Sequence, residues 1–344
     1  MSDTWLRTAG SPLQVAVIGA GSWGTAFARH LTRCGLATTL LARRPEQAEA
    51  LRKHRRNPDY LSFLELPPQL AYGSYENSDL RSFDLLVIAL PSKAYVEVVR
   101  ALAPRVRAGA GLLSLTKGVE PSSRRRFSEV LRLEFEFLQP AVAVLSGPNQ
   151  AEEVALGQPT ATVIASTDLG YAQALQELIT NENLRAYVNA DLVGVELAGA
   201  VKNVVALATG MSDGLGYGDN ARAALVTRGL AEISRLGVAL GAAPQTFTGL
   251  AGLGDLVGTC TSRHSRNRLA GELIAQGHDA AHVEDEMGMV AEGLTAARAV
   301  RALAREHGVE MPIIENVVAV VFEGKSVPAS VRDLMTRQPR SEFH

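Results

Sequence analysis

A lysine inside an otherwise apolar stretch is the side chain that most directly suggests chemistry. Lys202 lies in VELAGAVKNVVALATG, a helix-like segment whose other charged or amide side chains are Glu196 and Asn203. Burying an unpaired ammonium is costly. Burial also lowers the pKa of a lysine toward neutral pH, where the amine becomes a useful general acid or base. The competing interpretation is structural, with the lysine stem crossing apolar surface until the ammonium reaches water.

A glycine-rich turn near the start of the chain has the spacing of a dinucleotide-binding loop. In VAVIGAGSWGTAFARHL, Gly19, Gly21 and Gly24 follow a predicted strand and open a predicted helix. Such glycines allow a tight turn, close approach of the backbone to a pyrophosphate and close packing of helix on strand. The helix N-terminus offers N–H groups to the phosphates. Ser22 and Trp23 are predicted to contact the dinucleotide; the alternatives are a capping hydroxyl and a packing indole.

The end of the second predicted strand indicates which dinucleotide binds. An acidic residue there accepts a hydrogen bond from a ribose 2′-OH, whereas an arginine meets a 2′-phosphate. This chain has LLARRP, which presents Arg43 and Arg44 after Ala42 and no carboxylate. NADP(H) is therefore the preferred cofactor, with NAD(H) also able to bind, unless both arginines are ordinary surface cations.

Further polar residues follow predicted strands, at the edge where open parallel sheets bind ligands. TKGVE places Lys117 after one strand, and SGPNQAEEV places Gly147, Asn149 and Ala151 after the next. The segment LPSKAYVEVV is interpreted as chiefly structural, with Ser92 able to cap the helix behind it.

A phosphate-binding segment is predicted in the second half of the chain. LGDLVGTCTSRHSRNRLAGE holds Asp255 in a glycine-rich joint, followed by Ser265, Arg266 and Asn267 at a predicted helix start. A helix N-terminus, a hydroxyl, an amide and a guanidinium together suit a phosphate dianion. Taken alone, Ser265 would be an N-cap and Arg266 an exposed cation.

The elements that must position these residues fall into two groups along the chain. Over residues 13–190, short β-branched runs alternate with helical patterns, which predicts a parallel, doubly wound sheet of the Rossmann type. The predicted strands are QVAVIG, TTLLAR, DLLVIALP, GLLSLTKG, AVAVLSGP, ATVIAS and LRAYVN. After Asp191 the pattern is helical, at 191–211, 221–241, 265–277, 291–307 and 313–323. The expected fold is α/β, with a dinucleotide-binding domain over 1–190 and an all-helical substrate and catalytic domain over 191–344.

Composition argues against several other classes of protein. The chain has 344 residues, 47% of them hydrophobic, and a net charge of −2, so no nucleic-acid partner is expected. The densest basic run, RKHRR at 52–56, is interpreted as a solvated helix face, with a phosphate neighbour as the alternative. Cys34, Cys260 and the seven histidines lack metal-ligand spacing, so no metal is expected. With no apolar leader and no membrane-type segment, the expected location is cytoplasmic, without a membrane partner.

Taken together, the motifs resemble one enzyme family. GAGSWGTA, TKGVE, SGPNQAEEV, VELAGAVKNVVALATGMSDGLGYGDNARAAL, GLAGLGDLVGTC, SRNRLAGE and VAEGLTAA stand in that order over about residues 14–330. The chain resembles bacterial NAD(P)-dependent glycerol-3-phosphate dehydrogenase, which interconverts dihydroxyacetone phosphate and sn-glycerol 3-phosphate. The resemblance implies a second domain like the C-terminal domain of 6-phosphogluconate dehydrogenase, a homodimer, and a supply of glycerol 3-phosphate for glycerophospholipid synthesis.

The resemblance also implies roles for individual residues. Lys202 would be the proton acceptor, and Lys117 would bind substrate near the nicotinamide. The implied substrate contacts are Lys117, Gly147, Asn149, Lys202, Asp255, Ser265, Arg266 and Asn267. To the loop glycines Gly19, Gly21 and Gly24, the resemblance adds the cofactor contacts Ser22, Trp23, Arg43, Arg44, Lys117, Ala151, Arg266, Val290 and Glu292. Asn149 is a departure, because the bacterial motif usually reads Gly-Pro-Ser at this place.

Two other functions stay open at this level. One is a related dehydrogenase of the same architecture that acts on a β-hydroxy acid or a sugar-acid phosphate, although the SRN segment favours a phosphorylated substrate. The other is a nucleotide-sensing binding protein without turnover. Such a protein is expected to lack either the lysine base or the phosphate site.

Overall fold

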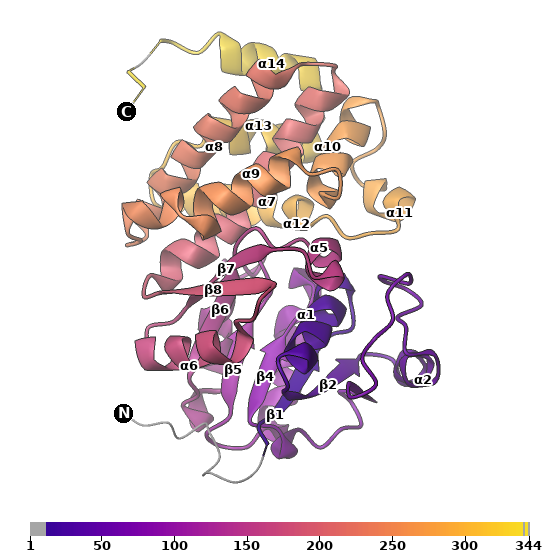
Figure 1. Cartoon of the computed structure of the whole chain (residues 1–344). Helices are drawn as coiled ribbons and strands as arrows, with labels where there is room; N and C mark the ends of the chain where they lie inside the picture. Colours follow the sequence, from indigo (N-terminus) through magenta and orange to yellow (C-terminus); the bar gives the residue numbers. More distant parts are fainter. Residues whose placement is uncertain (1–11, 340, 343–344) are drawn as a thin grey trace.

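The computed structural model describes residues 12–339 and 341–342 of the chain. Figure 1 shows two parts of the molecule: a twisted sheet with its helices in the lower half, and a bundle of helices above it. The chain passes from the last strand into the first helix of the bundle at Ala190 and Asp191. The α/β architecture with a Rossmann-type sheet followed by a helical part is therefore confirmed.

The sheet has eight strands in the order β3-β2-β1-β4-β5-β6-β7-β8. Their bounds are β1 Gln14–Ile18, β2 Ala37–Ala42, β3 Ala71–Ser74, β4 Leu85–Ile88, β5 Gly111–Ser114, β6 Val142–Ser146, β7 Thr160–Ala165 and β8 Leu184–Asn189. Seven of them coincide with the predicted runs. The unpredicted strand is β3, whose sequence AYGS is short, partly exposed and poor in β-branched residues.

Both faces of the central strands are buried because helices cover the sheet on each side. One face packs against α1 (Ser22–Arg33) and α6 (Leu169–Ile179), and the other against α3 (Tyr95–Leu102) and α4 (Phe127–Glu134). Along β1, Val15 and Val17 belong to the first layer, and Ala16 and Ile18 to the second. This alternation explains why the central strands are apolar throughout instead of alternating with polar residues.

The sheet is not wholly parallel, and the sequence-based prediction is corrected on this point. β6 and β7 pair antiparallel, whereas the other neighbouring strands pair parallel. The connection between them holds only the six-residue helix α5 (Ala151–Leu156). So short a helix does not carry the chain back along the sheet for a parallel crossover, and β7 therefore returns beside β6 in the opposite direction.

The C-terminal part is helical throughout its regular structure. Its helices are α7 Leu192–Gly214, α8 Asp219–Ala239, α9 Asp255–Thr261, α10 Arg266–Ala275, α11 Val283–Met287, α12 Glu292–Glu306, α13 Pro312–Glu323 and α14 Val327–Met335. The five long helices predicted from sequence are α7, α8, α10, α12 and α13. The helices α9, α11 and α14 were not predicted, because each is nine residues or shorter and offers little periodicity.

The central element of the bundle is α7, which packs against α8, α10 and α12. Asp191 caps its first turn by accepting a hydrogen bond from the Gly194 N–H at 2.9 Å. Within the described part of the chain, α7 alone is long and apolar enough to suit a membrane span, and 89% of that window is buried inside the protein. Its hydropathy is therefore that of a core helix.

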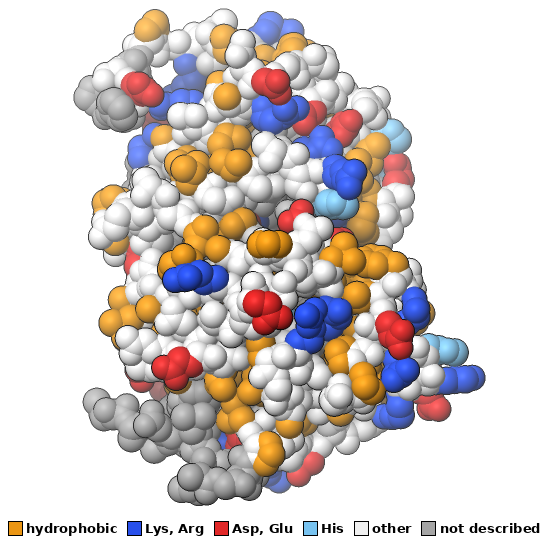
Figure 2. Space-filling view, in the orientation of Figure 1, with side chains coloured by type: hydrophobic (Ala, Val, Ile, Leu, Met, Phe, Trp, Pro, Cys, Tyr) orange, Lys and Arg blue, Asp and Glu red, His pale blue; other side chains and the backbone are white. Residues whose placement is uncertain are grey.

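The surface carries charges of both signs, which lie interspersed over the face shown in Figure 2. Basic side chains gather at the edge where α2 (Pro45–His54) lies in Figure 1, and the residues at 52–56 are exposed there. Some of these basic residues have local ion-pair partners; Arg55, for example, pairs with Glu65 at 3.1 Å. The arrangement is that of a solvated helix end.

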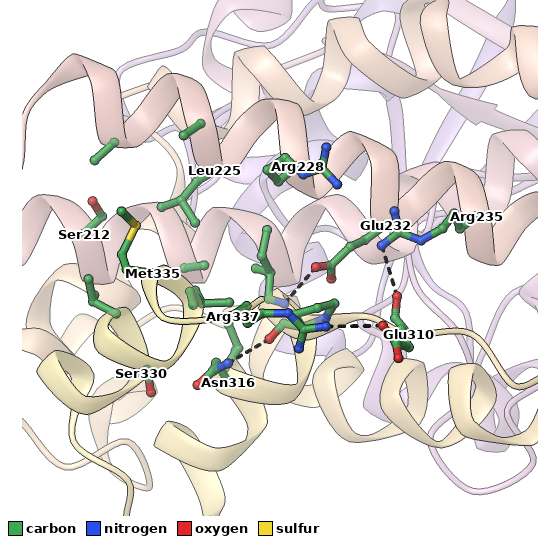
Figure 3. Close-up of a pocket in the computed structure, with 18 of the residues that line it drawn as sticks. Ser212, Leu225, Arg228, Glu232, Arg235, Glu310, Asn316, Ser330, Met335 and Arg337 are labelled. Atoms are coloured by element: carbon green, nitrogen blue, oxygen red, sulfur yellow. Dashed lines mark hydrogen bonds and ion pairs between the residues drawn. The ribbon is translucent and has the colours of Figure 1, made fainter. Parts of the chain in front are cut away.

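A groove of about 1030 Å³ lies between α8, α13 and α14, and Figure 3 shows it from one side. At its edge the Glu232 carboxylate accepts hydrogen bonds from the N–H groups of Ile313 and Ile314, at 2.8 and 3.3 Å. This carboxylate therefore caps the start of α13 from outside the helix. None of the site residues predicted from sequence lines the groove.

Candidate active site

A buried carboxylate between two ammonium groups forms the centre of the candidate site. Asp255, the first residue of α9, accepts hydrogen bonds from Lys202 on α7 and, at 2.8 Å, from Lys117, which follows β5. The side chains of Asp255 and Lys202 are only 3% and 6% exposed. Three segments far apart in the sequence thus meet where the sheet faces the helical bundle.

Burial and neighbouring charges set the proton affinity of this cluster. Burial lowers the pKa of Lys202 to about 8; the charge of Lys117 adds to the lowering, and Asp255 opposes it. For Asp255, burial alone would raise the carboxyl pKa, but the ammonium groups of Lys117 and Lys202 outweigh it and hold the pKa below its usual value. The site therefore contains a lysine able to exchange protons near neutral pH, beside a carboxylate that is ionised at that pH.

Lys117 also ties the glycine-proline-asparagine segment to the site. Its ammonium donates to the Gly147 carbonyl and to Oδ1 of Asn149, each at 3.0 Å. The amide nitrogen of Asn149 in turn donates to Oγ1 of Thr162 at 3.0 Å. Asn149, the departure from the family motif, is thus held at both ends of its amide, and the structure brings it together with Lys117 and Asp255.

The predicted phosphate segment forms the start of α10. Ser265 is the N-cap, and its hydroxyl accepts a hydrogen bond from the Arg268 N–H at 3.3 Å. Arg266 is exposed at the first helical position, and its charge acts on the Glu292 carboxyl. Asn267 is buried one residue further on. A helix N-terminus, a hydroxyl and a guanidinium do therefore occur together.

Asn267 links α10 to α7 and α12. Its amide nitrogen donates to Oδ1 of Asn203 at 3.0 Å, and its carbonyl oxygen accepts from the Gly293 N–H at 2.8 Å. Asn203 follows Lys202 directly on α7. The phosphate segment and the lysine helix are thus connected by a pair of buried amides.

The glycine loop has the shape that dinucleotide binding requires. Gly19 has φ +109°, and a Cβ there would lie 2.4 Å from the Ala89 carbonyl oxygen. At Gly24 a Cβ would lie 1.9 Å from the Gly19 carbonyl oxygen, so the helix approaches the strand closely. Gly21 has nothing within 4 Å of such a Cβ and faces open space. Helix α1 starts at Ser22 without a side-chain cap, which leaves its first N–H groups available to phosphate.

Two other residues near this loop were predicted to contact the cofactor. Trp23 packs its ring against Phe27 in a tilted arrangement with centroids 5.4 Å apart, and its indole N–H is buried without a partner among the described residues. An orphaned buried donor beside a glycine loop fits a site that a polar ligand completes. Ala151 is the half-buried first residue of α5, which packs against α1.

The two arginines after β2 differ in their surroundings. Arg44 pairs with Asp59 at 2.7 Å on the surface. Arg43 is exposed, and its guanidinium makes no ion pair or hydrogen bond within the described part of the chain, although its main-chain carbonyl accepts from the Ser74 hydroxyl at 3.5 Å. Of the two, Arg43 is therefore the guanidinium available to a 2′-phosphate.

Glu292 connects the helical bundle back to the sheet. Its carboxylate accepts hydrogen bonds from the Ser92 hydroxyl and, at 3.2 Å, from the Ser92 N–H. The prediction that Ser92 caps the helix behind it is wrong, because its hydroxyl is bound to Glu292 and makes no cap. Val290, two residues before Glu292, is half-buried in the same connection.

The sequence-based prediction missed two side chains of the site and one element. Thr259 accepts a hydrogen bond from the Lys202 ammonium at 2.7 Å, and Ser92 binds Glu292 as described. Asp255 lies at the start of a helix instead of in a joint, so Thr259 stands one turn after it on α9. The spacing of aspartate and threonine in DLVGT was the available signal.

A Rossmann-type sheet, an open glycine loop and a buried lysine between two domains define the class: a nicotinamide-dinucleotide-dependent oxidoreductase with a helical second domain. The sequence models of the NAD-dependent glycerol-3-phosphate dehydrogenase family match both parts, its N-terminal model over residues 14–172 and its C-terminal model over 191–332. The chain belongs to this family.

Individual relatives agree with that assignment over nearly the full length. A glycerol-3-phosphate dehydrogenase [NAD(P)+] of Salinibacter ruber is 47% identical, with 95% of this chain and 96% of the relative covered. The corresponding protein of Chlorobium luteolum is 46% identical, with 96% and 99% covered. The crystal structure of glycerol-3-phosphate dehydrogenase from Coxiella burnetii superposes with a TM-score of 0.90 at 39% identity, covering 95% and 99% of the two chains.

Proposed function

We propose that this chain catalyses the reversible reduction of dihydroxyacetone phosphate to sn-glycerol 3-phosphate, with Lys202 as general acid and base. The observation that carries the proposal is the buried Lys202 ammonium, whose pKa near 8 suits proton exchange at neutral pH. Family membership supports the substrate, because the similar proteins of Salinibacter and Chlorobium carry that activity in their names.

When bound, a nicotinamide would supply or accept the hydride at the substrate carbon. In the reducing direction Lys202 donates its proton to the carbonyl oxygen, and in the oxidising direction the neutral amine takes the proton from the hydroxyl. Asp255 and Thr259 orient the Lys202 amine through its other hydrogen bonds. Lys117, held by the same carboxylate, adds a second positive charge that favours the anionic substrate. Gly147 and Asn149 line the pocket on the side of the sheet.

The phosphate of the substrate is assigned to the N-terminus of α10. The first N–H groups of that helix, the Arg266 guanidinium and the Ser265 and Asn267 side chains surround the proposed position, and all these groups suit a dianion. Because Ser265 and Asn267 already hold internal hydrogen bonds, Arg266 and the helix end carry most of the charge recognition.

Exchanging Arg43 should change the preference between the two nicotinamide cofactors. We expect NADP(H) to be preferred, and Arg43→Gln to raise the KM for NADPH by about tenfold or more while leaving the KM for NADH nearly unchanged, since only NADPH carries the 2′-phosphate. Steady-state kinetics with both cofactors measures this. Arg44→Gln is the matched control, because Arg44 already pairs with Asp59. Equal effects of both substitutions on NADPH would contradict the assignment to Arg43.

The other proposed cofactor contacts surround the same loop. The glycines at 19, 21 and 24 with Ser22 and Trp23 would hold the pyrophosphate side, and Ala151 would lie at the neighbouring helix start. Val290, Glu292 and Arg266 would approach from the helical bundle, and Lys117 would lie near the nicotinamide.

Removing the Arg266 guanidinium should weaken binding of the phosphorylated substrate specifically. Arg266→Ala is expected to raise the KM for dihydroxyacetone phosphate by about ten- to a hundredfold, or about 1.4 to 2.7 kcal/mol, which is the size of a hydrogen bond to a charged group. The control is Arg263→Ala, an exposed arginine of the preceding loop that contacts His264. An unchanged KM in Arg266→Ala at saturating NADPH would exclude Arg266 as the phosphate ligand.

The assay that tests the whole proposal follows NADPH and NADH oxidation with dihydroxyacetone phosphate. Turnover with this substrate, and none with β-hydroxy acids in the reverse direction, supports the proposal. Tight NADPH binding without turnover over a panel of phosphorylated ketones would favour the nucleotide-sensing function instead.

The remaining features of the proposed enzyme concern its organisation and setting. We propose a dinucleotide-binding domain over 1–190, a substrate domain over 191–344, and a cytoplasmic homodimer that supplies glycerophospholipid synthesis. Sedimentation at micromolar concentration tests the dimer.

A further inference from the structure

Helix α7 carries a second buried charge that the proposed reaction does not use. The Glu196 carboxylate is only 5% exposed and lies six residues before Lys202. A buried ion pair rarely adds stability over apolar residues of the same size, so its presence raises the question of what it positions.

The partners of Glu196 all lie at the start of α4, in the sheet domain. Its Oε2 accepts from Nη1 of Arg126 at 2.9 Å and from the Ser128 hydroxyl at 2.5 Å, and its Oε1 accepts from the Ser128 N–H at 2.8 Å. Arg126 is the N-cap residue of α4 and also pairs with Glu129 at 2.6 Å. Glu196 therefore acts as an external cap that fastens α4 to α7.

The segment that Glu196 fastens begins with Lys117. A β-bridge pairs Val119 with Arg126, so the chain between them forms a closed hairpin with Lys117 two residues before its base. The Glu120 N–H donates to the Arg125 carbonyl at 2.8 Å within this hairpin. A displacement of Arg126 would therefore be transmitted to Lys117 over a short, hydrogen-bonded path.

Lys117 crosses α7 midway between Glu196 and Lys202. A Cβ at Gly199 would lie 3.5 Å from Cγ of Lys117 and 3.0 Å from Oγ of Ser146, so the lysine stem lies over this glycine. Positions 196, 199 and 202 follow one another at intervals of three along a ridge of the helix. At the end of this ridge both lysine ammoniums reach Asp255.

We propose that Glu196 is a positioning residue that clamps the hairpin of residues 119–126 onto α7. Because Lys117 lies two residues before this hairpin, the clamp sets the distance between the ammonium groups of Lys117 and Lys202. This inference rests on the proposed role of Lys202 and adds the element that fixes its charged neighbour. The clamp acts across the two domains, because Glu196 lies on α7 while Arg126 and Ser128 belong to the sheet domain.

The test compares pH–rate profiles of the full-length wild type, Glu196→Ala and Glu196→Gln with dihydroxyacetone phosphate and NADPH. Release of the hairpin should lower kcat/KM of Glu196→Ala by about ten- to a hundredfold, because misplacement by about 1 Å can cost that much. The basic limb of its profile should also move to higher pH, because a more distant Lys117 charge no longer lowers the pKa of Lys202. Glu196→Gln keeps the side-chain volume and the Ser128 contact, and it should show a smaller shift in the same direction.

Glu232→Gln is the matched control, since Glu232 is also a buried external cap and lies at the edge of the groove of Figure 3. It should lose thermal stability without moving the pH limb. In a Lys117→Met background, Glu196→Ala should have little further effect on kcat/KM. An unmoved limb in both Glu196 variants, or equal effects with and without Lys117, would overturn the clamp. Absence of the limb in the wild type would instead count against the role of Lys202, so the two failures are distinguishable.

Discussion

Lys202→Ala is expected to lower kcat by about 10²- to 10⁴-fold, the usual contribution of a positioned general acid or base. The affinity for NADPH should stay nearly intact, because the hydrogen bonds of the Lys202 ammonium go to Asp255 and Thr259 and to no residue of the glycine loop. Stopped-flow kinetics with a fluorescence titration of NADPH separates the two effects. Near-normal turnover in this variant would discard the assignment.

The pH–rate profile of the wild type tests the same role of Lys202 in both reaction directions. The reduction needs the ammonium form of Lys202, so its rate should fall as the pH rises through about 8. The oxidation needs the neutral amine, so its rate should rise over the same range. A profile that changes in the same sense in both directions would not fit one group acting as acid and base.

The central architecture of this protein is predictable from local sequence pattern. β1, β4 and β6 are apolar runs that helices cover on both faces, and the glycine spacing of the loop after β1 leaves few alternatives. Lys202 is also recognisable in the sequence, because a charged side chain is unusual within a long apolar helix. By contrast, β3 is an edge strand with half-exposed residues, and nothing in AYGS distinguishes it from a loop.

The pairings that define the site could not be read from the sequence. Asp255 was expected to contact the substrate, but its position between Lys117 and Lys202 depends on residues 138 and 53 positions away. The same holds for Glu292, which meets Ser92 across 200 residues. Such contacts arise from the packing of α7, α9 and α12 on the sheet, and sequence spacing reports only neighbours within one element. The predicted parallel direction of β7 was wrong for a related reason, because the direction of this strand depends on the length of α5.

Asp255→Asn should have the second largest effect, because it removes the one negative charge that Lys117 and Lys202 share. Leaving two ammonium groups in a buried space without a counter-charge should lower the free energy of unfolding by about 3 to 5 kcal/mol. Since Asp255 opposes the lowering of the Lys202 pKa, its loss should also move that pKa below about 8. Chemical denaturation and the pH–rate profile of the reduction measure the two consequences.

The pH dependence separates this electrostatic effect from a simple loss of packing. A lysine whose folded-state pKa lies below its unfolded value binds fewer protons when folded, so stability rises with pH through that interval. The destabilisation by Asp255→Asn should therefore be larger at pH 6 than at pH 9, where Lys202 can be neutral in the folded state. Asp213→Asn is the matched control, because Asp213 also lies between two cations, Arg222 at 2.9 Å and Arg268 at 3.0 Å. Arginines keep their charge throughout this range, so the control should lose stability about equally at both pH values. It should also leave the basic limb set by Lys202 in place. If Asp255→Asn likewise lost the same stability at both pH values, the Asp255 carboxylate would not control the pKa of Lys202.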